Sequence, residues 1–304
     1  MKVIPFMAWR RFAAFFSLAA MLVAGGALVT KSLNWGLDFT GGTLVEVAYG
    51  ESANLPEIRS SLEASGYSGA VVVAFGTDRD VLIRLPLDYS DEQGVSMVEV
   101  LRAATDEPVE LRRIEFVGPA VGEELREQGG LAMLLALGLV MLYVGFRFQI
   151  KFAVGAVMAL AHDVLFVLGY FSVLGLEFDL TVLAAILAVI GYSLNDTIVV
   201  ADRIRENFRK LRRRSPSDVI DVSLTETLGR TLVTSLTTLL VLVALALFGG
   251  EMIHGFALAL LAGVAIGTYS SVYVSATILL AMGVTKEDVA IPVREGGSED
   301  GSQV

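Results

Sequence analysis

The sequence predicts a polytopic α-helical membrane protein with six transmembrane helices and one external α+β domain of the ferredoxin-like type, inserted between the first and second helices. Three observations lead to this prediction. Of the 304 residues, 54% are hydrophobic and 18% are charged, and the mean hydropathy of +0.66 is far above that of an ordinary water-soluble domain. Charge-poor runs recur along the chain, and the surplus acidic charge is confined to one stretch.

Six charge-poor runs are about long enough to cross a membrane, since a helix needs about 20 apolar residues to span a hydrocarbon core of ~30 Å. The first run follows Arg10 and Arg11, and it is longer than the apolar part of a cleaved secretory signal. We therefore expect an uncleaved signal-anchor there. The six runs cover residues 12–30, 131–148, 152–174, 180–201, 231–250 and 255–283.

The distribution of Lys and Arg predicts the orientation. With a cytoplasmic N-terminus, the inside segments hold 15 of the 23 basic residues, whereas the outside turns near 175–179 and 251–254 hold none. By the positive-inside rule, both termini are expected in the cytoplasm and residues 31–130 outside. The inside segments are residues 1–11, 147–151, 203–230 and 284–304.

Residues 31–130 are predicted to form a separate external domain. They carry 18 acidic and eight basic side chains, so this region alone accounts for the chain's net charge of −10. Such an acidic surface disfavours a nucleic-acid partner. The predicted order is βαββαβ, typical of a ferredoxin-like fold, which hosts many functions. Strands are expected at 44–49, 70–75, 81–85 and 109–117, and helices at 55–65 and 90–104.

The rest of the chain divides into three parts. Residues 1–30 hold the N-terminus and first span, and residues 131–283 hold a five-helix bundle with a basic cytoplasmic loop at 203–230. Seven basic residues lie between 203 and 214, which indicates topology and contact with anionic membrane lipid. The tail at 284–304 is rich in Gly, Ser and acidic residues and is expected to be disordered.

The composition excludes several classes of function. Cysteine is absent, and the two histidines are His162 and His254. A disulfide framework, a thiolate centre and a cysteine nucleophile are therefore excluded, and no histidine-based metal site is expected. We expect no metal, no cofactor and no enzymatic activity.

Two aspartates lie inside predicted spans, where an ionised side chain costs about 2.5 to 3.5 kcal/mol at a helix centre. Asp196 follows Leu180 by 16 residues, or about 24 Å of helix, and Asp163 follows Lys151 by 12 residues, or about 18 Å. Each carboxylate therefore needs a physical or functional reason to be there.

The surroundings of Asp196 point to proton chemistry. Asn195 flanks it on the fourth span, and Arg230 and Thr234 form a polar stripe on the fifth. An aspartate whose arginine partner comes and goes can take up and release a proton. The alternatives are a static ion pair or, for Asp163, a hydrogen bond between helices. An intramembrane aspartyl protease is disfavoured, because a Gly-x-Gly-Asp context is missing.

Five ordered motifs resemble the SecF family, the smaller of the paired SecD and SecF membrane subunits of bacterial protein export. The first is Gly-Leu-Asp-Phe-Thr-Gly-Gly at 36–42, and the second is Val-Gly-Pro-x-Val-Gly at 117–122. The others are Ala-Leu-x-His-Asp at 159–163, Gly-Tyr-Ser-Leu-Asn-Asp-Thr at 191–197 with Asp-Arg-Ile-Arg-Glu at 202–206, and Arg-Thr-Leu-x-Thr-Ser at 230–235.

The resemblance implies a member of the resistance-nodulation-division superfamily in the bacterial inner membrane. Such a protein uses the proton gradient to help unfolded polypeptides leave the SecYEG translocon on the outer side, together with SecD. It also implies that Asp196 carries the proton and that Arg230 is coupled to it, with Thr234 close by. It assigns no equally firm role to Asp163.

The segment at 36–42 is expected to be a joint between the first span and the external domain. Its candidate residues are Gly36, Asp38, Phe39, Gly41 and Gly42. Gly41 and Gly42 permit backbone angles that other residues resist. A tight turn without motion is the alternative.

Two rival functions remain open: a half-transporter that exports small amphiphiles by proton antiport, and a passive assembly scaffold. The small external domain favours polypeptide handling over the first rival. Replacement of Asp196 separates the scaffold from both, because a scaffold should tolerate it.

Overall fold

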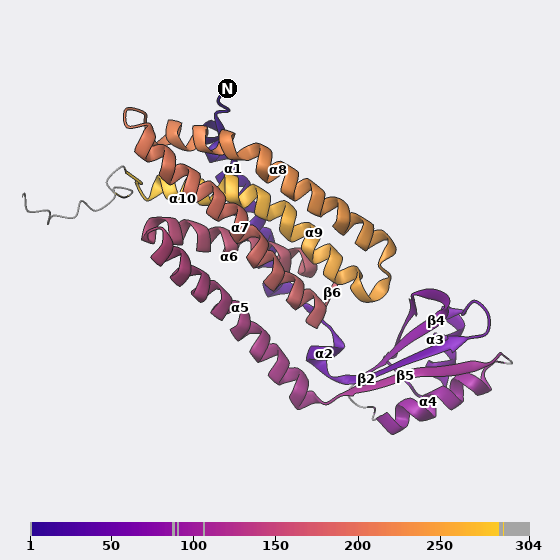
Figure 1. The fold of residues 1–304 in the computed structure, drawn as a ribbon. Coiled ribbons are helices and arrows are strands. Elements are labelled where there is room, and N and C mark those ends of the chain that lie inside the picture. The colour runs from indigo at the N-terminus through magenta and orange to yellow at the C-terminus, as the bar shows by residue number, and fades with distance from the viewer. Residues whose placement is uncertain (1, 87–88, 90, 106, 286–287, 289–304) are drawn as a thin grey trace, which may run out of the picture.

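The computed structural model describes residues 2–86, 89, 91–105, 107–285 and 288. It consists of a long helical bundle with a small α+β domain at one end (Figure 1). Six segments of the described chain are long and apolar enough to cross a membrane, which confirms the six predicted spans. The bundle contains η1 (Phe6–Trp9), α1 (Arg10–Thr30), α5 (Pro119–Arg147), α6 (Ile150–Leu174), α7 (Leu180–Lys210), α8 (Pro216–Phe248), α9 (Glu251–Val272) and α10 (Val274–Ala281).

Three helices extend well beyond the apolar runs that predicted them. α5 begins at Pro119, because Gly118 is extended and proline is favoured in the first helical turn. Its first turns therefore belong to the region 31–130. The stretch 203–230, expected as a loop, is mostly helical: α7 continues to Lys210, and α8 begins at Pro216, capped by the Ser215 side chain. Of the tail at 284–304, only residues 284, 285 and 288 are among those described.

Small residues let α9 approach its neighbours closely. A Cβ at Gly263 would lie 2.1 Å from Val189 Cγ2, and one at Gly267 would lie 3.1 Å from Ser193. Small residues spaced along a membrane helix allow such close packing against a neighbour. α9 thus lies directly against α7, on the side that carries the polar residues of both helices.

The external domain has the predicted βαββαβ order and the strand arrangement of a ferredoxin-like fold. Its four antiparallel strands lie in the order β3-β4-β2-β5. Alternate strand residues such as Val45, Val47 and Ile83 are fully buried and pack with Leu62 of α3 and Met97 of α4. The elements are β2 (Gly42–Tyr49), α3 (Leu55–Ala64), β3 (Val71–Phe75), β4 (Thr77–Leu85), α4 (Asp91–Ala103) and β5 (Val109–Val117).

Three short elements lie at the junction of the domain and the bundle. β1 (Asn34–Trp35) follows α1 and pairs in parallel with β6 (Glu177–Phe178), which lies between α6 and α7. α2 (Leu37–Thr40) follows β1 and leads into β2. The chain is therefore bound to the membrane bundle, through the pairing of β1 with β6, just before it enters the external domain.

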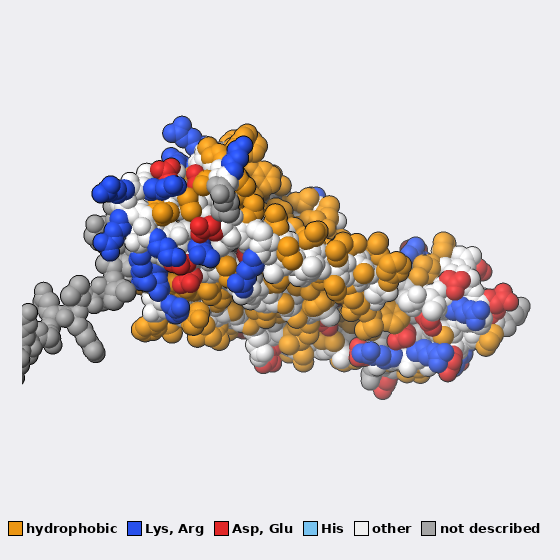
Figure 2. All heavy atoms as spheres, turned by 45° about the horizontal axis from the view of Figure 1, so that its top comes forward, with side chains coloured by type: hydrophobic (Ala, Val, Ile, Leu, Met, Phe, Trp, Pro, Cys, Tyr) orange, Lys and Arg blue, Asp and Glu red, His pale blue; other side chains and the backbone are white. Residues whose placement is uncertain are grey.

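The surface has three zones along the molecule's length (Figure 2). Hydrophobic side chains cover the middle, and charged side chains of both signs cover the external domain. Basic side chains gather at the opposite end, where α7 ends with Arg209 and Lys210 and the connection to α8 holds Arg212, Arg213 and Arg214. This basic end is the one that the positive-inside rule predicts to lie in the cytoplasm.

Candidate functional site

Asp196 lies inside the bundle, where α7, α8 and α9 meet. Its side chain is buried, with the residue 8% exposed. Thr231 of α8 donates a hydrogen bond of 2.7 Å to Oδ1, and Ser271 of α9 donates one of 2.9 Å to Oδ2. The carboxylate is thus held by two neutral hydroxyl groups from neighbouring helices.

Asp163 lies on α6 and is completely buried. Its Oδ2 accepts hydrogen bonds of 2.7 Å from Ser193 of α7 and from Ser270 of α9. The Nδ1 atom of His162 lies 3.2 Å from Oδ1. Asp163 therefore links α6 to both α7 and α9 through hydrogen bonds.

The two aspartates are linked through consecutive residues of α9, since Ser270 contacts Asp163 and Ser271 contacts Asp196. Within the described residues, neither carboxylate forms an ion pair with Lys or Arg. An ionised carboxylate without a cation is costly at membrane depth. Both carboxylates therefore depend on hydroxyl groups of neighbouring helices for their hydrogen bonds.

The structure does not bring Arg230 to Asp196. Arg230 is exposed on α8, and among the described residues its guanidinium has no hydrogen-bond or ion-pair partner. The next residue, Thr231, faces α7, and a step of one residue turns a helix side chain by about 100°. Thr234 is also exposed and donates to the Arg230 carbonyl at 3.0 Å, and Asn195 is exposed on α7.

Sequence reasoning missed the direct partners of the two aspartates. Thr231, Ser270 and Ser271 were not singled out as partners. Hydroxyl side chains recur at helical spacing in apolar spans, where each needs a hydrogen-bond acceptor. That signal could have identified them, but the acceptor of each hydroxyl is fixed only by how the helices pack. No three His, Asp or Glu side chains lie together as a metal site within the described chain.

The first half of the segment at 36–42 is bound to the bundle. Asp38 Oδ2 accepts a hydrogen bond of 2.9 Å from the backbone N–H of Leu180, at the start of α7. Gly36 donates its N–H to the Phe178 carbonyl at 2.8 Å, and Phe39 stacks on the Phe178 ring at 5.7 Å. A carboxylate at a helix N-terminus satisfies a free N–H group and interacts favourably with the helix dipole.

The second half of that segment redirects the chain into the external domain. Gly41 and Gly42 have φ angles of 74° and 134°, which residues other than glycine rarely adopt. A Cβ at Gly42 would also lie 2.5 Å from the Leu85 carbonyl oxygen. Gly122 of α5 also packs closely, since a Cβ there would lie 2.9 Å from the Phe39 carbonyl oxygen.

Three features define the junction of the external domain with the bundle. Gly42 pairs with Val117, so the chain enters and leaves the domain through adjacent strands. Arg84 of β4 forms an ion pair with Glu177 of β6. A shallow cleft of about 350 Å³ separates the β3–β4 turn from the α8–α9 turn and is lined by Ala74, Gly76, Thr77, Asp78, Ala246, Leu247, Gly250 and His254.

Two models of known protein families match parts of this chain. Residues 97–285 match the family model described as protein export membrane protein SecD/SecF, C-terminal, and residues 26–53 match the SecD/SecF GG motif. The chain belongs to the SecD/SecF family. Within it, the chain is 53% identical to the protein translocase subunit SecF of Vibrio alginolyticus, over 98% of this chain and 96% of that relative. The SecF subunit of Pseudomonas aeruginosa is 49% identical, over 98% and 97%.

Two solved structures of SecDF share the fold. The crystal structure of SecDF from Thermus thermophilus, described as a translocon-associated membrane protein, has a TM-score of 0.83 and 39% identity, and it covers 92% of this chain. SecDF in a super-membrane-facing form has a TM-score of 0.71, 40% identity and 93% coverage. This chain spans 39% of the length of each of those chains. It is therefore a multi-pass membrane protein of the SecF branch, a group of protein translocase subunits.

Proposed function

We propose that this SecD/SecF family member couples inward proton movement across the bacterial inner membrane to late steps of polypeptide translocation on the outer side. The observation that carries the proposal is the environment of Asp196. This carboxylate is buried in the bundle, and its partners Thr231 and Ser271 are neutral hydroxyls. Such a site favours a protonated carboxylate in one state and requires a cation in the other.

The membrane potential supplies enough free energy for such a cycle. One elementary charge crossing the membrane is worth about 2.3 kcal/mol per 100 mV. A few kcal/mol is sufficient to move a two-state equilibrium by one to two orders of magnitude. In the charged state Arg230 would turn toward Asp196, which requires α8 to rotate about its axis relative to α7.

The helix α7 offers a direct mechanical link to the external side. Asp196 lies on this helix, and the Leu180 N–H at its outer end is bound by Asp38. A shift of α7 would therefore act on the segment at 36–42 and on β2, which continues from Gly42 into the external domain. In this proposal the bound half of the segment transmits the shift, and Gly41 and Gly42 form the joint.

Exposed polar residues of the bundle support a membrane partner. Arg230 and Asn195 lie on neighbouring helices α8 and α7 with their side chains turned outward. Polar groups at such positions normally face protein or water rather than lipid. We infer that SecD covers this surface, and that the pair acts at the SecYEG translocon on an unfolded polypeptide. The solved SecDF chains, which extend beyond this chain's length, support that inference.

Replacement of Asp196 by Asn tests the proposal in cells that contain no other copy of this protein. The amide retains the size of the side chain and can still accept from Thr231, so the amount of protein in the membrane should remain near normal. Secretion that depends on the proton gradient should fall at least tenfold per molecule, because the site can no longer change charge.

Asp179→Asn is the matched control. Asp179 immediately precedes α7, the helix that contains Asp196, and caps it by accepting a hydrogen bond of 2.8 Å from the Val182 N–H. Asn caps a helix about as well as Asp, so this variant removes the same charge without loss of the cap. Normal secretion per molecule in the Asp196→Asn cells would refute proton coupling at this residue and favour a scaffold.

A further inference from the structure

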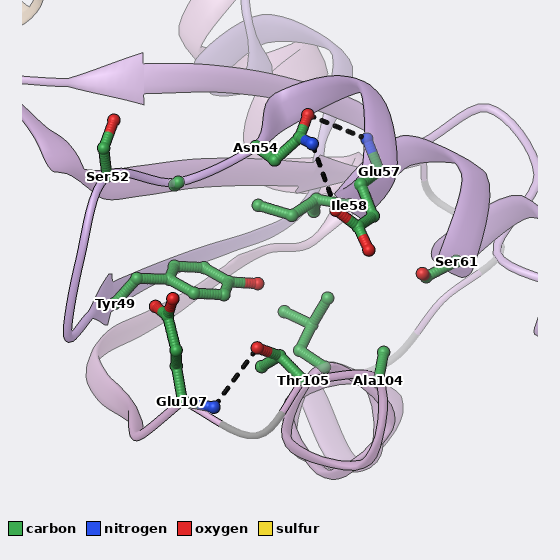
Figure 3. Close-up of a pocket in the computed structure, with 11 residues that line it drawn as sticks. Tyr49, Ser52, Asn54, Glu57, Ile58, Ser61, Ala104, Thr105 and Glu107 are labelled. Atoms are coloured by element: carbon green, nitrogen blue, oxygen red, sulfur yellow. Dashed lines mark hydrogen bonds between the residues drawn. The ribbon is translucent and has the colours of Figure 1, made fainter.

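A small cavity lies between α3 and α4 of the external domain (Figure 3). It is at the end of β2 that is remote from the membrane bundle. β2 runs from Gly42 at the junction to Tyr49 beside the cavity, a distance of about 23 Å at the usual strand rise. The cavity has a volume of about 100 Å³. It is lined by Tyr49, Ser52, Ala53, Asn54, Glu57, Ile58, Ser61, Leu101, Ala104, Thr105 and Glu107.

The Tyr49 side chain is aimed into this cavity without a partner. The residue is only 9% exposed, and its hydroxyl group ends in the space between the α3 side, with Glu57 and Ser61, and Thr105 on the opposite side (Figure 3). Among the described residues, none forms a hydrogen bond with that hydroxyl. The hydroxyl remains accessible from the cavity, so a ligand atom there can form a hydrogen bond with it.

The cavity is also negatively charged. Glu57 is hydrogen-bonded by the Asn54 amide at 3.0 Å, and Glu107 by the Glu51 N–H at 3.2 Å. Within the described chain, neither carboxylate pairs with a Lys or Arg side chain. Burial, followed by the charges of Glu107 and Glu57, raises the pKa of Tyr49 to about 12. The phenol therefore stays protonated at neutral pH, in a potential that attracts a cation.

We propose that this cavity binds the ammonium group of a lysine side chain in the exported polypeptide as it emerges on the outer side. An ammonium group is a compact charge with three donors. The Tyr49 hydroxyl, the Thr105 hydroxyl and the two carboxylates offer oxygen acceptors around the space. The volume accommodates the end of one long side chain, so a flexible chain can be held by one residue at a time.

The source of the lysine rests on the proposed function, whereas the binding chemistry rests on the cavity itself. The cavity lies on the side of the domain remote from the bundle, which membrane-embedded segments do not reach but an emerging polypeptide does. Single weak contacts suit a site that must release a moving chain after binding it.

Binding of a synthetic peptide to the full chain in lipid nanodiscs tests the inference. The probe is a fluorescent unstructured peptide with one central lysine, compared with the same peptide in which norleucine replaces that lysine. We expect the lysine peptide to bind about tenfold more tightly, as is typical of a hydrogen-bonded charge. Glu107→Gln should abolish this preference, and Tyr49→Phe, which keeps the ring and the fold, should reduce it several-fold.

Glu63→Gln is the matched control, because Glu63 is an exposed carboxylate on α3 outside the cavity lining. Its preference for lysine should equal that of the unchanged chain. Equal binding of the two peptides, or an equal loss in Glu63→Gln and Glu107→Gln, would overturn the inference. Asp196→Asn should leave peptide binding unchanged, so a failure of proton coupling and a failure of this site give different results.

Discussion

The ion pair between Arg84 and Glu177 is expected to hold the external domain in its present orientation. Arg84 lies on β4, on the sheet face opposite the buried Ile83 and Leu85. Glu177 lies on β6, at the end of the bundle next to the external domain. The chain enters and leaves the domain through two adjacent strand ends, at Gly42 and Val117. Loss of the ion pair should therefore increase rotation about those strand ends rather than unfold the domain.

The magnitude follows from the partial burial of the pair. The side chains of Arg84 and Glu177 are 28% and 31% exposed, so the pair should contribute about 1 kcal/mol, at the upper end of the range for accessible ion pairs. Its loss should raise the ratio of displaced to docked domains about fivefold. Arg84 Nε is buried and lacks a partner among the described residues. Glu177→Gln leaves the partly buried guanidinium of Arg84 without its carboxylate. It should therefore lower the stability of the docked orientation more than the double variant Arg84→Gln, Glu177→Gln does.

Distance measurements between spin labels can detect the displaced population. The chain contains no cysteine, so single cysteines introduced at Asp78 and Leu247 label only the two sides of the cleft between the domain and the α8–α9 turn. In nanodiscs, pulsed electron paramagnetic resonance should show a longer-distance component that is about fivefold larger in Glu177→Gln. Gly36→Ala should also enlarge the longer-distance component, because the new Cβ would lie 2.9 Å from Glu177 Oε1 and disturb the ion pair.

Glu115→Gln is the control for this experiment. Glu115 pairs with Arg113 on the same strand, so this variant breaks an ion pair of the external domain that does not reach the bundle. Its distance distribution should match that of the labelled parent. An unchanged distribution in Glu177→Gln, or a change of the same size in Glu115→Gln, would refute the proposed role of the Arg84–Glu177 pair.

Two further predictions concern packing and pH. Gly263→Ala should lower the free energy of unfolding by about 1 to 3 kcal/mol, because the new Cβ would lie 2.1 Å from Val189 Cγ2. Thermal unfolding in detergent should detect the loss, and Val189→Ala in the same chain should restore much of it. The raised pKa of Tyr49, about 12, stabilises the fold below pH 10, and this contribution is lost as the pH rises toward 12. The unfolding midpoint of Tyr49→Phe should therefore fall less over that range than the parent midpoint, and equal slopes would contradict the pKa shift.

Hydrophobic runs and β-strand alternation in the sequence are sufficient to predict the architecture. Each span is visible because about 20 apolar residues are needed to cross the hydrocarbon core. The last strand was predicted at 109–117, which matches β5 (Val109–Val117), since its alternating pattern ends at Gly118. Helix ends were less predictable where polar residues continue a helix beyond the membrane, as in α5 and α7.

The sequence also identified Asp196 and Asp163, because a charged residue in an apolar span is conspicuous by its cost. It could not determine which side chains hydrogen-bond to them. Asn195, next to Asp196 in the sequence, and Arg230, next to Thr231, are turned outward, whereas Thr231 and Ser271 reach the Asp196 carboxylate.

A sequence by itself thus determines which residues are too polar for their surroundings, because that depends on composition along one helix. Only the tertiary structure decides their partners, because the rotation of each helix about its axis is set by packing against its neighbours. The cavity beside Tyr49 has the same origin. Its lining comes from the end of β2, the start of α3 and the end of α4. Those segments meet only when the sheet and its two helices have packed together.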